Sequence, residues 1–410
     1  MREVMEVPSP CHVSGIEEEY VRITNLRKFA VVIAASTLVL AGCSSSSDDA
    51  GGAYAGPVQD TPGTINVLAW PGYAEDGSTD PNVDWVTPFE EATGCTVNVK
   101  TYGTSDEAVQ LMQGGGYDVV SASGDASLRL IYGGDLQPVN LDLIPNYAGI
   151  FENLKDRPWN TVDGKNYGVP HGRGANVLQY TIGKVKAPDS WSVVFEPNSP
   201  AKGKVTAYDS AIYIADAAVY LMSTKPELGI TDPYALDQTQ FDAAMALLEQ
   251  QKPLIAEYWS DYTKYIGAVQ SGSVTVGTSW QVIANVLNGE KETVGAVKPK
   301  EGATGWSDTW MISSKTEAID CAYKWLNHII EPATNAQAAE WFGEAPANSK
   351  ACALTANKDH CKLYHAEETD YWTDVYYWKT PTENCLDGRT DVKCVPYAEW
   401  VKAWSSFRNK

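Results

Sequence analysis

The sequence predicts an α/β fold with a mostly parallel sheet. Three short segments with the length and apolar or alternating pattern of strands occur at residues 65–70, 96–101 and 117–121. Between them lie two helical patterns, residues 85–93 and 105–113, and each is followed by glycine. Strands that alternate with helices at this spacing indicate βαβ units, in which neighbouring strands run parallel.

The middle of the chain continues the same alternation. Residues 204–208 and 274–280 are typical of strands, and residues 237–256 and 316–330 are typical of amphipathic helices. The segment after Cys352 is rich in Tyr, Trp and Cys, and it predicts no regular element. A chain of this length exceeds one typical hydrophobic core, so two domains are expected.

The N-terminal region resembles a bacterial lipoprotein signal peptide. An apolar run over residues 29–40 follows a short basic segment and leads into Leu-Ala-Gly-Cys, which ends at Cys43. The resemblance implies cleavage before Cys43 and lipid on its sulfur. Residues 1–42 would then be removed, and the protein would be held outside the cytoplasm, periplasmic or at the cell surface, by a lipid anchor in the cell membrane.

The residues around this signal support the same interpretation. Residues 43–63 are rich in Ser, Gly, Asp and Pro and are expected to form a flexible tether. Such a tether argues against the alternative, a plain secretory signal followed by an ordinary cysteine. Residues 1–20 are acidic and fit no signal peptide, so translation is expected to start nearer Val21.

The composition argues against a nucleic-acid-binding protein. The formal net charge is -21 at pH 7, and the sequence contains no basic block. This acidity is compatible with cationic ligands, but a solubilising surface is the simpler interpretation.

Six cysteines follow Cys43, and an even number in an exported chain indicates disulfides. Two pairs share the same short spacing, which favours local loops and leaves the last two cysteines to form a long-range bridge. The predicted pairs are Cys352–Cys361, Cys385–Cys394 and Cys95–Cys321. The histidines near Cys361 are interpreted as coincidental, so neither a metal site nor a cofactor is predicted.

The motifs of common enzyme classes are absent from the sequence. There is no GxSxG nucleophile elbow, no HExxH zinc motif and no phosphate-binding GxxxxGK[ST] loop. Of the five histidines, His171 alone lies beside a glycine-rich turn, where a structural role is expected. The sequence therefore predicts a binding protein rather than an enzyme.

Several segments, taken in order, resemble the substrate-binding proteins of polyamine (spermidine/putrescine) ABC importers. The resemblance spans residues 64–348, and its landmarks include INVLAWPGYAEDG, YDVVSASGDASLRLIYGGDLQPVN, YGVPHGRGAN, VTVGTSW and KEGATGWSDTWMISS. No single landmark is decisive, but their order and spacing are specific for the family. The resemblance implies a monomeric receptor that captures an amine-bearing small molecule and delivers it to an ABC permease and its ATPase.

The family has the two-lobed type II periplasmic-binding-protein fold, in which two α/β lobes joined by crossing strands close on the ligand. Carried over to this sequence, the crossings fall near Arg173, Ser307 and Ala351. The implied lobes are residues 64–173 with 307–350, and residues 174–306 with 351–410. Cys95 and Cys321 then fall in the same lobe, which supports pairing them.

The resemblance also implies a pocket for an amine. Aromatic faces can cover the methylene chain of a polyamine and attract its cations, and carboxylates can fix its ammonium groups. The positions that match pocket residues of the family are Trp70, Tyr73, Ser123, Trp280, Trp306 and Asp308. Any one tryptophan could be ordinary core packing, but several at the ends of predicted strands favour a pocket, because the ligand crevice of an open α/β sheet lies there.

The sequence departs from the family at several pocket positions. The second-lobe Asp-x-x-Glu of the family aligns on Ser210 and Tyr213, so both carboxylates are missing and Asp209 is the nearest substitute. Two family tyrosines align on Asp125 and Glu344. The candidate site residues among these positions are Asp125, Asp209, Tyr213 and Glu344.

Arg173 occupies a position near the first crossing that is aromatic in the family. As a structural residue it would pair with a surface carboxylate. As a pocket residue it would set a cation beside Asp308, Asp125 or Glu344, and a pocket with both charges suits a zwitterionic amine, amino acid-like or an aminophosphonate. It could also neutralise an excess of carboxylates. These alternatives stay open, with a polyamine as the first expected ligand and a zwitterionic amine as the second.

Two other classes of function are alternatives. An enzyme on the same fold, similar to a thiaminase, would need a reactive thiol in the cleft, and the predicted disulfides leave none. A surface adhesion or sensor protein would use the tail from Cys352 to Lys410 to meet a protein partner. A lobe-two surface held by two disulfides is the simpler interpretation of that tail.

Overall fold

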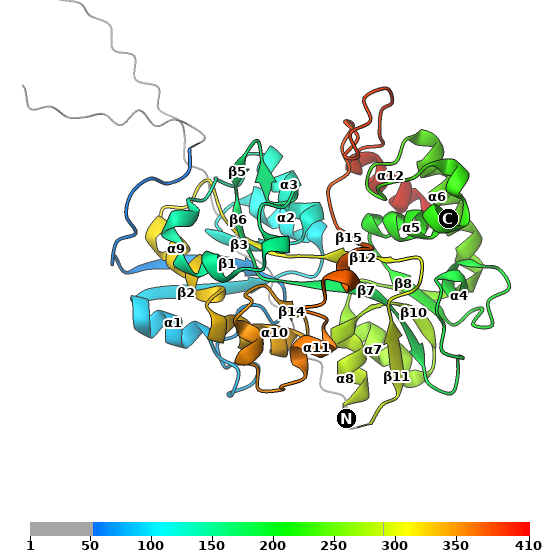
Figure 1. Cartoon of the computed structure of the whole chain (residues 1–410), viewed down its shortest axis with the longest axis horizontal. Coiled ribbons are helices and arrows are strands. Elements are labelled where there is room, and N and C mark those ends of the chain that lie inside the picture. The colour runs from blue at the N-terminus through cyan, green and yellow to red at the C-terminus, as the bar shows by residue number, and fades with distance from the viewer. Residues whose placement is uncertain (1–51, 290) are drawn as a thin grey trace, which may run out of the picture. The chain divides into compact units, whose positions relative to one another are not determined.

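Two β-sheets with helices packed around them make up the described part of the protein, as the computed structural model in Figure 1 shows. The structure describes residues 52–289 and 291–410. The expected signal peptide, the anchor Cys43 and the start of the expected tether lie outside these residues. The α/β class predicted from the sequence is confirmed. Among the described helices, none is both long and apolar enough to cross a bilayer.

The first sheet has five strands in the order β2-β1-β3-β13-β6. These strands are β1 (Gly63–Ala69), β2 (Cys95–Thr101), β3 (Val119–Ala122), β6 (Gly168–Pro170) and β13 (Thr309–Ile312). The associated helices are α1 (Val86–Thr93), α2 (Ser105–Gly114), α3 (Gly124–Tyr132), α9 (Ile319–Ile329) and α10 (Pro332–Phe342), with a small hairpin of β4 (Thr161–Val162) and β5 (Lys165–Asn166). Ile65, Val67, Trp310 and Trp325 are buried in one hydrophobic core. We call this sheet with its helices the first half.

The boundaries of the early elements follow from their sequence. Helix α1 ends where Gly94 adopts a φ of 69°, a left-handed conformation that glycine tolerates. Helix α2 begins after Thr104, whose hydroxyl accepts a hydrogen bond from the backbone N–H of Glu107. The first three strands and two helices therefore lie close to their predicted ranges.

The second sheet runs in the order β15-β12-β7-β10-β8-β9, and β11 and β14 also pair with β7. The strands are β7 (Gly172–Thr181), β8 (Val205–Tyr208), β9 (Ile255–Trp259), β10 (Val276–Trp280), β11 (Val294–Val297), β12 (Ala303–Trp306), β14 (Ala345–Pro346) and β15 (Val375–Tyr377). The helices are α4 (Ser192–Phe195), α5 (Ile214–Thr224), α6 (Gln238–Gln251), α7 (Tyr262–Ser271), α8 (Gln281–Asn288), α11 (His360–Leu363) and α12 (Tyr397–Arg408). A second core contains Trp191, Tyr213 and Trp400. We call this sheet with its helices the second half.

Both sheets are mixed, whereas the sequence predicted a mostly parallel sheet. Strand β1 pairs in parallel with β2 and β3, as expected for βαβ units. Strand β13 pairs antiparallel with β3 and β6, and β7 pairs antiparallel with β10 and β12. The antiparallel pairs arise next to the points where the chain enters a sheet from the other one, without a helical crossover in between.

The predicted helix over residues 237–256 is too long. Helix α6 ends at Gln251, and strand β9 begins at Ile255. Pro253 lies between them and cannot donate a backbone hydrogen bond to continue the helix. The apolar spacing continues past this proline, which explains the wrong boundary.

The chain passes between the two sheets at three points; two lead directly from strand to strand, and the third leads from β13 of the first sheet through α9 and α10 to β14 of the second. His171 separates β6 in the first sheet from β7 in the second, and Ser307 and Asp308 separate β12 from β13. His171 and Asp308 therefore lie where the two halves meet. The lobe boundaries expected from the sequence, with a third crossing near Ala351, remain a prediction.

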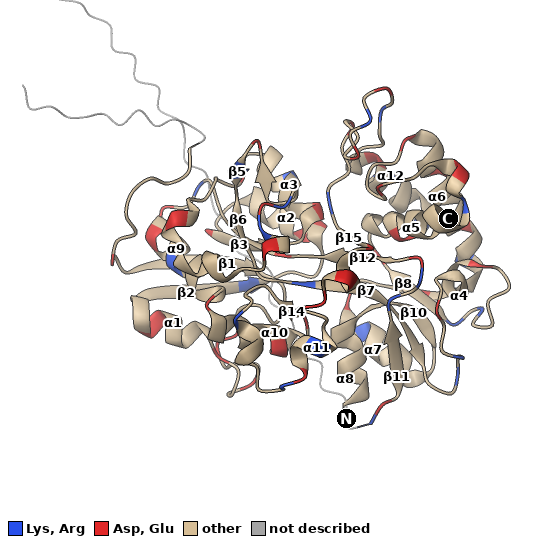
Figure 2. Cartoon of the chain, viewed as in Figure 1, with Lys and Arg blue, Asp and Glu red and all other residues tan. Residues whose placement is uncertain are grey.

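Charged side chains lie over both halves. Figure 2 shows Asp and Glu interspersed with Lys and Arg on elements of both sheets. This dispersed arrangement fits the solubilising surface that the composition suggested.

Three disulfides join the six cysteines that follow Cys43, in the pairing expected from the sequence. They are Cys95–Cys321, Cys352–Cys361 and Cys385–Cys394. The first bridge links β2 to α9 across a sequence separation of 226 residues, and the other two close loops within the tail.

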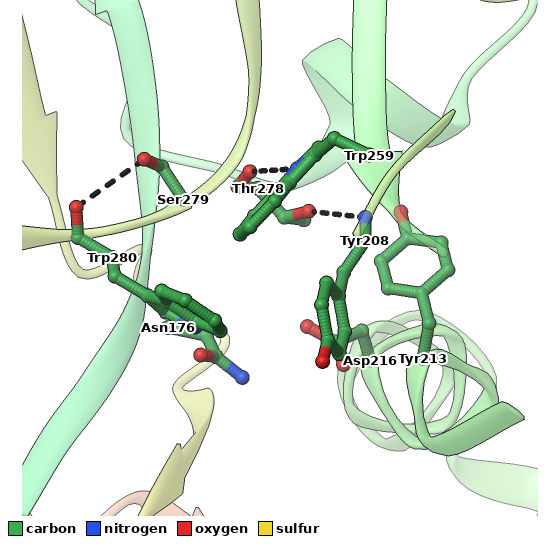
Figure 3. A pocket seen from close by; sticks show the side chains of 8 residues that line it. All are labelled: Asn176, Tyr208, Tyr213, Asp216, Trp259, Thr278, Ser279 and Trp280. Atoms are coloured by element: carbon green, nitrogen blue, oxygen red, sulfur yellow. Dashed lines mark hydrogen bonds between the residues drawn. The ribbon is translucent and has the colours of Figure 1, made fainter. Parts of the chain in front are cut away.

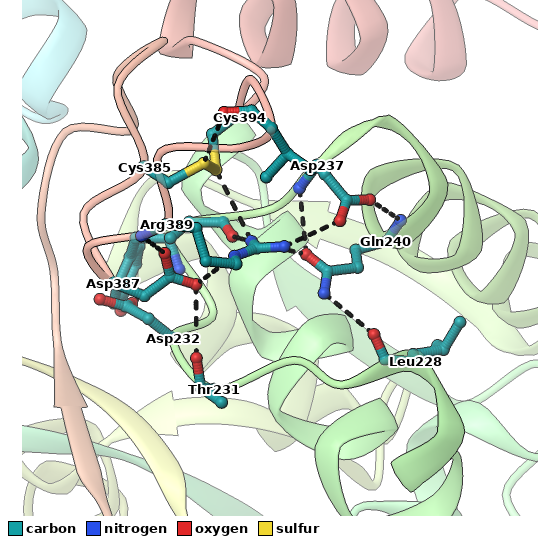
Figure 4. Close-up of polar contacts among 12 residues, drawn as sticks. Leu228, Thr231, Asp232, Asp237, Gln240, Cys385, Asp387, Arg389 and Cys394 are labelled. Carbon is teal, nitrogen blue, oxygen red and sulfur yellow. Dashed lines mark hydrogen bonds and ion pairs between the residues drawn. A yellow bond between two sulfur atoms is a disulfide. The ribbon is translucent and has the colours of Figure 1, made fainter.

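The tail packs against the second half. Helix α12 buries Trp400 and Phe407 in the second core. Figure 4 shows how Arg389 fastens the loop of the Cys385–Cys394 bridge: its guanidinium donates hydrogen bonds to the carboxylates of Asp387 and Asp237 at 2.7 and 2.9 Å. Since Asp237 is also the N-cap of α6, one arginine joins the tail to the start of this helix.

Arg389→Ala is expected to destabilise the protein by about 2 kcal/mol, because the carboxylates of Asp387 and Asp237 lose a charged partner while staying largely buried. Urea unfolding measures the change. Lys402→Ala is the control, since its ion pair with Glu399 is exposed and should contribute less than about 0.5 kcal/mol. Equal effects of the two substitutions would contradict the role of Arg389.

Candidate functional site

Asp308 lies at the second crossing with 3% of its surface exposed. Its Oδ2 accepts a hydrogen bond from the Tyr73 hydroxyl at 2.8 Å, and its Oδ1 accepts one from the Ser123 hydroxyl at 2.5 Å. Tyr73 follows β1 and Ser123 follows β3, so the carboxyl ends of two parallel strands hold both donors. The structure thus brings together three residues that the sequence predicted for the site.

Glu344 adds a second carboxyl group to this cluster. It is buried, and its Oε2 lies 3.2 Å from the Tyr73 hydroxyl oxygen. Its Oε1 lies 3.3 Å from Nε2 of His171. The Nδ1 of His171 accepts a hydrogen bond from the indole N–H of Trp310 at 3.0 Å, so the proton of the neutral imidazole sits on Nε2 and faces Glu344. Nε2 of His171 and Oε1 of Glu344 lie close together, but neither atom has a hydrogen-bond partner among the described residues.

Burial shifts the charge states of this cluster. It raises the pKa of Asp308 to about 6, and burial together with the nearby charge of Asp308 raises the pKa of Glu344 well above its usual range. Burial lowers the pKa of His171 to about 3, so the imidazole is neutral at pH 7. Within the described part of the chain, neither carboxyl group forms an ion pair with Lys or Arg. A cation beside them would lower both carboxyl pKa values and stabilise the ionised forms.

The second half contributes a pocket at the carboxyl ends of β8, β9 and β10, shown in Figure 3. Its empty volume of about 220 Å³ includes space that is open to solvent. Aromatic rings dominate its wall: the Trp280 ring lies 5.0 Å from that of Trp259 and 5.6 Å from that of Tyr208, centroid to centroid. The lining residues are Asn176, Tyr208, Tyr213, Asp216, Trp259, Thr278, Ser279 and Trp280.

Aromatic contacts connect this wall to the first half. The ring of Trp70, which follows β1, lies 6.4 Å from the Trp280 ring in an edge-on arrangement and 4.5 Å from the Tyr102 ring. Trp70 and Trp280, both predicted for the site, therefore meet although they come from different halves. Aromatic faces of this kind can cover a methylene chain and attract its cationic ends.

Asp216 in α5 is a pocket residue that the sequence analysis missed. It is buried, its Oδ1 accepts a hydrogen bond from the Thr304 hydroxyl at 3.1 Å, and burial raises its pKa to about 7. Figure 3 shows its carboxyl group beside Tyr208. Asp216 lies three residues after Tyr213, about one helical turn further on. A search at helical spacing from the missing Asp-x-x-Glu would have found it.

Three other predicted site residues differ in their surroundings. The carboxylate of Asp209 accepts hydrogen bonds from the guanidinium of Arg408 at 2.9 and 3.0 Å. Tyr213 lines the pocket, and its hydroxyl accepts a hydrogen bond from Gln251 at 2.8 Å. Asp125 is buried at the start of α3, its Oδ2 has no hydrogen-bond partner in the described part of the chain, and burial raises its pKa to about 7.

The two glycines beside Arg173 define the face of β7 on which its side chain lies. A Cβ at Gly172 would lie 2.3 Å from the carboxyl group of Glu344, and a Cβ at Gly174 would lie 2.3 Å from the ring of Trp306. Glycine is required at both positions for these close approaches. Because successive residues of a strand point to opposite faces, the side chain of Arg173 leaves β7 on the face opposite to Glu344.

On that face, Arg173 contacts the tail. Its guanidinium carbon lies 4.2 Å from the centroid of the Trp372 ring, and Nη2 donates a hydrogen bond to the Ala366 carbonyl at 2.9 Å. A weaker contact joins Nη1 to the Tyr377 hydroxyl at 3.4 Å. No ion pair of Arg173 occurs among the residues that the structure describes. Its partners are therefore aromatic rings and a carbonyl rather than the carboxylates considered from the sequence.

The chain crosses between two α/β halves, and buried carboxyl groups and facing tryptophans lie at their junction. This arrangement is that of a periplasmic solute-binding protein. Residues 84–362 match the family of bacterial extracellular solute-binding proteins, and the chain belongs to this family. The family resemblance inferred from the sequence motifs is thereby confirmed.

Individual relatives are distant in sequence. The putrescine-binding periplasmic protein SpuD of Pseudomonas aeruginosa is 27% identical over 305 residues, which cover 70% of this chain and 81% of the relative. A putative spermidine/putrescine ABC transporter from Listeria monocytogenes has a similar structure, with a TM-score of 0.69, 20% identity and coverage of 84% of this chain and 98% of that one. The Atu4243 GABA receptor has a TM-score of 0.61 at 19% identity, covering 84% and 97%. These likenesses confirm the predicted fold class.

Proposed function

We propose that this protein is the substrate-binding component of an ABC importer and captures a polyamine-type cation, such as putrescine or spermidine, between its two halves. The observation that carries the proposal is the pair of buried carboxyl groups, Asp308 and Glu344, which have no Lys or Arg partner among the described residues. Buried charges require a counter-charge, and a ligand ammonium group would provide it. The binding of putrescine by relatives such as SpuD supports the same assignment.

The shape of the site suits a linear diamine. One ammonium group would bind at Asp308, and the methylene chain would lie against Trp70 and Trp280, whose rings approach from the two halves. The second ammonium group would bind at Asp216, which takes the place of the carboxylates that the family carries at Ser210 and Tyr213. Because Asp308 and Asp216 would each bind one end of the diamine, the bound ligand would link the two halves.

Calorimetric titration of the purified protein with putrescine, spermidine and agmatine tests this proposal. We expect a saturable one-site binding heat and a melting temperature that rises with ligand concentration. GABA and 2-aminoethylphosphonate are the comparison ligands. Binding of these zwitterions alone would overturn the polyamine assignment, and the absence of binding by all five compounds would overturn capture of an amine altogether.

A zwitterionic amine is the second candidate ligand, and one observation favours it. The indole N–H groups of Trp70, Trp306 and Trp378 are buried and have no hydrogen-bond partner among the described residues. A ligand carboxylate or phosphonate could accept hydrogen bonds from such donors, whereas an ammonium group cannot. The titration with GABA distinguishes the two candidates.

We also propose that the protein is a monomeric lipoprotein attached through Cys43 to the cell membrane, where its partners are a permease and an ATPase. The lipobox and the polar tether of residues 43–63 support this proposal. Cys43→Ser should release the protein from the membrane fraction. A variant that still sediments with membranes would contradict the anchor.

The protein is proposed to perform no chemistry of its own. A thiaminase-like enzyme would need a free thiol, and the six described cysteines form three disulfides. The tail, which an adhesion protein would present to a partner, packs its α12 tryptophans into the second core. These contacts favour a receptor over either alternative.

A further inference from the structure

The segment Trp378–Thr380, which follows β15, lies outside the residues 84–362 that match the family. Figure 1 shows β15 beside β12, and the backbone N–H of Trp378 continues this pairing by donating to the Gly305 carbonyl at 2.8 Å. The indole of Trp378 stacks on the ring of Tyr208, with 6.0 Å between centroids and an interplanar angle of 11°. Because Tyr208 lines the pocket, the segment supports the pocket wall of the second half.

The same segment also contacts the first half. The carbonyl oxygen of Trp378 packs so closely on the start of α3 that a Cβ at Gly124 would lie 1.9 Å from it. The Thr380 hydroxyl donates a hydrogen bond to the backbone carbonyl of Asp125 at 2.7 Å. Trp378 therefore lies between the start of α3 in one half and Tyr208 in the other, at the junction where the carboxyl groups of the site also lie.

The indole N–H of Trp378 is a buried donor that is left unpaired, as are those of Trp70 and Trp306 and that of Trp325 in the first core, among the residues that the structure describes. The side chain of Trp378 is almost fully buried. An unpaired buried donor is unfavourable in a core residue, where an apolar ring would pack without that cost. The Tyr208 ring lies 6.0 Å from the Trp378 ring and 5.6 Å from the Trp280 ring, so Trp378 packs behind the aromatic wall of the pocket and contacts it through Tyr208.

We propose that Trp378, packed between Tyr208 and the start of α3, holds Tyr208 at one end of the ligand cavity and thereby sets the length of the cation that fits. This inference rests on the proposed capture of a polyamine. Putrescine has four methylene groups between its amines, and spermidine is longer by an aminopropyl group. A smaller ring at position 378 would open space at this end of the cavity, which disfavours the short diamine through lost contacts and favours the longer cation.

The test compares the affinities for putrescine and spermidine in Trp378→Phe and in Trp400→Phe. Trp400 is also a buried tryptophan of the tail, but its ring contacts Phe241 in the second core, whereas the Trp378 ring stacks on the pocket residue Tyr208. We expect Trp378→Phe to shift the ratio of the two affinities about threefold or more toward spermidine, on the scale by which apolar pockets discriminate methylene groups. Trp400→Phe should leave the ratio unchanged.

Trp378→Ala should shift the ratio further in the same direction, with circular dichroism as the check that it folds. An unchanged ratio in Trp378→Phe, with polyamine binding retained, would overturn the role of Trp378 and leave the proposed function intact. A parent protein that binds no polyamine would overturn both. A shift of equal size in Trp400→Phe would assign the effect to core packing and would also overturn the proposal.

Discussion

Replacing Asp308 by asparagine is expected to weaken putrescine binding at least about 30-fold at neutral pH, because removing one partner of a buried, hydrogen-bonded charge pair costs roughly 2–5 kcal/mol. The amide keeps the size of the carboxyl group and still has an oxygen to accept a hydrogen bond from Tyr73 or Ser123. It carries no negative charge, so a buried ammonium group would face it without a counter-charge. Isothermal titration calorimetry measures the loss.

Asp209→Asn is the matched control for this substitution. It removes the same charge, but Asp209 is bound to Arg408 and is not a lining residue of the pocket. Its putrescine affinity should stay close to that of the parent protein. Without ligand the two variants should differ in stability as well, since Asp308→Asn removes an unpaired buried charge and Asp209→Asn breaks an ion pair. Full putrescine affinity in Asp308→Asn would refute the assignment of the ammonium site.

Putrescine affinity is expected to rise as the pH is raised from about 5 to about 8. Burial raises the pKa of Asp308 to about 6, so this carboxyl group is largely protonated at the lower pH. The ligand ammonium group requires the ionised carboxylate, and alkyl amines with pKa values near 10 stay protonated throughout. For Asp308 alone the affinity falls about tenfold per pH unit below its pKa, and the raised pKa of Glu344 acts in the same direction.

The ligand-free protein is expected to show the opposite trend at this residue. The folded-state pKa of Asp308 lies above its unfolded value, so the folded chain binds more protons between the two values. The unfavourable contribution of Asp308 to stability is therefore absent below about pH 4 and complete above about pH 6. The difference in unfolding free energy between Asp308→Asn and the parent should grow over this range. A putrescine affinity that falls with rising pH would contradict the first expectation, and a difference in unfolding free energy that stays constant from about pH 4 to about pH 6 would contradict the second.

The early part of the fold could be predicted from local sequence signals. The strands at β1, β2 and β3 combine apolar or alternating patterns with glycines or caps at the ends of the helices between them. Strand β7 had no such signal, because Gly172, Arg173 and Gly174 at its start are typical of a turn. Those glycines are present because Glu344 and Trp306 pack against the backbone there, and these contacts come from residues more than 100 positions away in the sequence.

Some residues of the candidate site could likewise be predicted from local sequence signals, and others could not. Tyr73, Ser123 and Asp308 follow or separate strands and share family landmarks, so the sequence was sufficient to place them in one cluster. Asp216 and Trp378 required the structure. Asp216 reaches the pocket through helical spacing from a motif that is absent, and Trp378 belongs to a tail without a recognisable pattern. The partners of Arg173 depend on which face of β7 carries its side chain, and that follows from tertiary contacts.

The ion pair between Asp209 and Arg408 has a consequence for the charge that the site can accept. Asp209 directly follows Tyr208 of the pocket wall, and its carboxylate is already occupied by a guanidinium from the last turn of α12. The guanidinium of Arg408 would thus compete with any ligand cation for the Asp209 carboxylate. A chain that lost this turn would expose one more free carboxylate next to the wall, and its preference should move toward ligands with more positive charges. For the proposed polyamine ligand, a helix that is not part of the pocket lining would thus limit how many positive charges the site can pair.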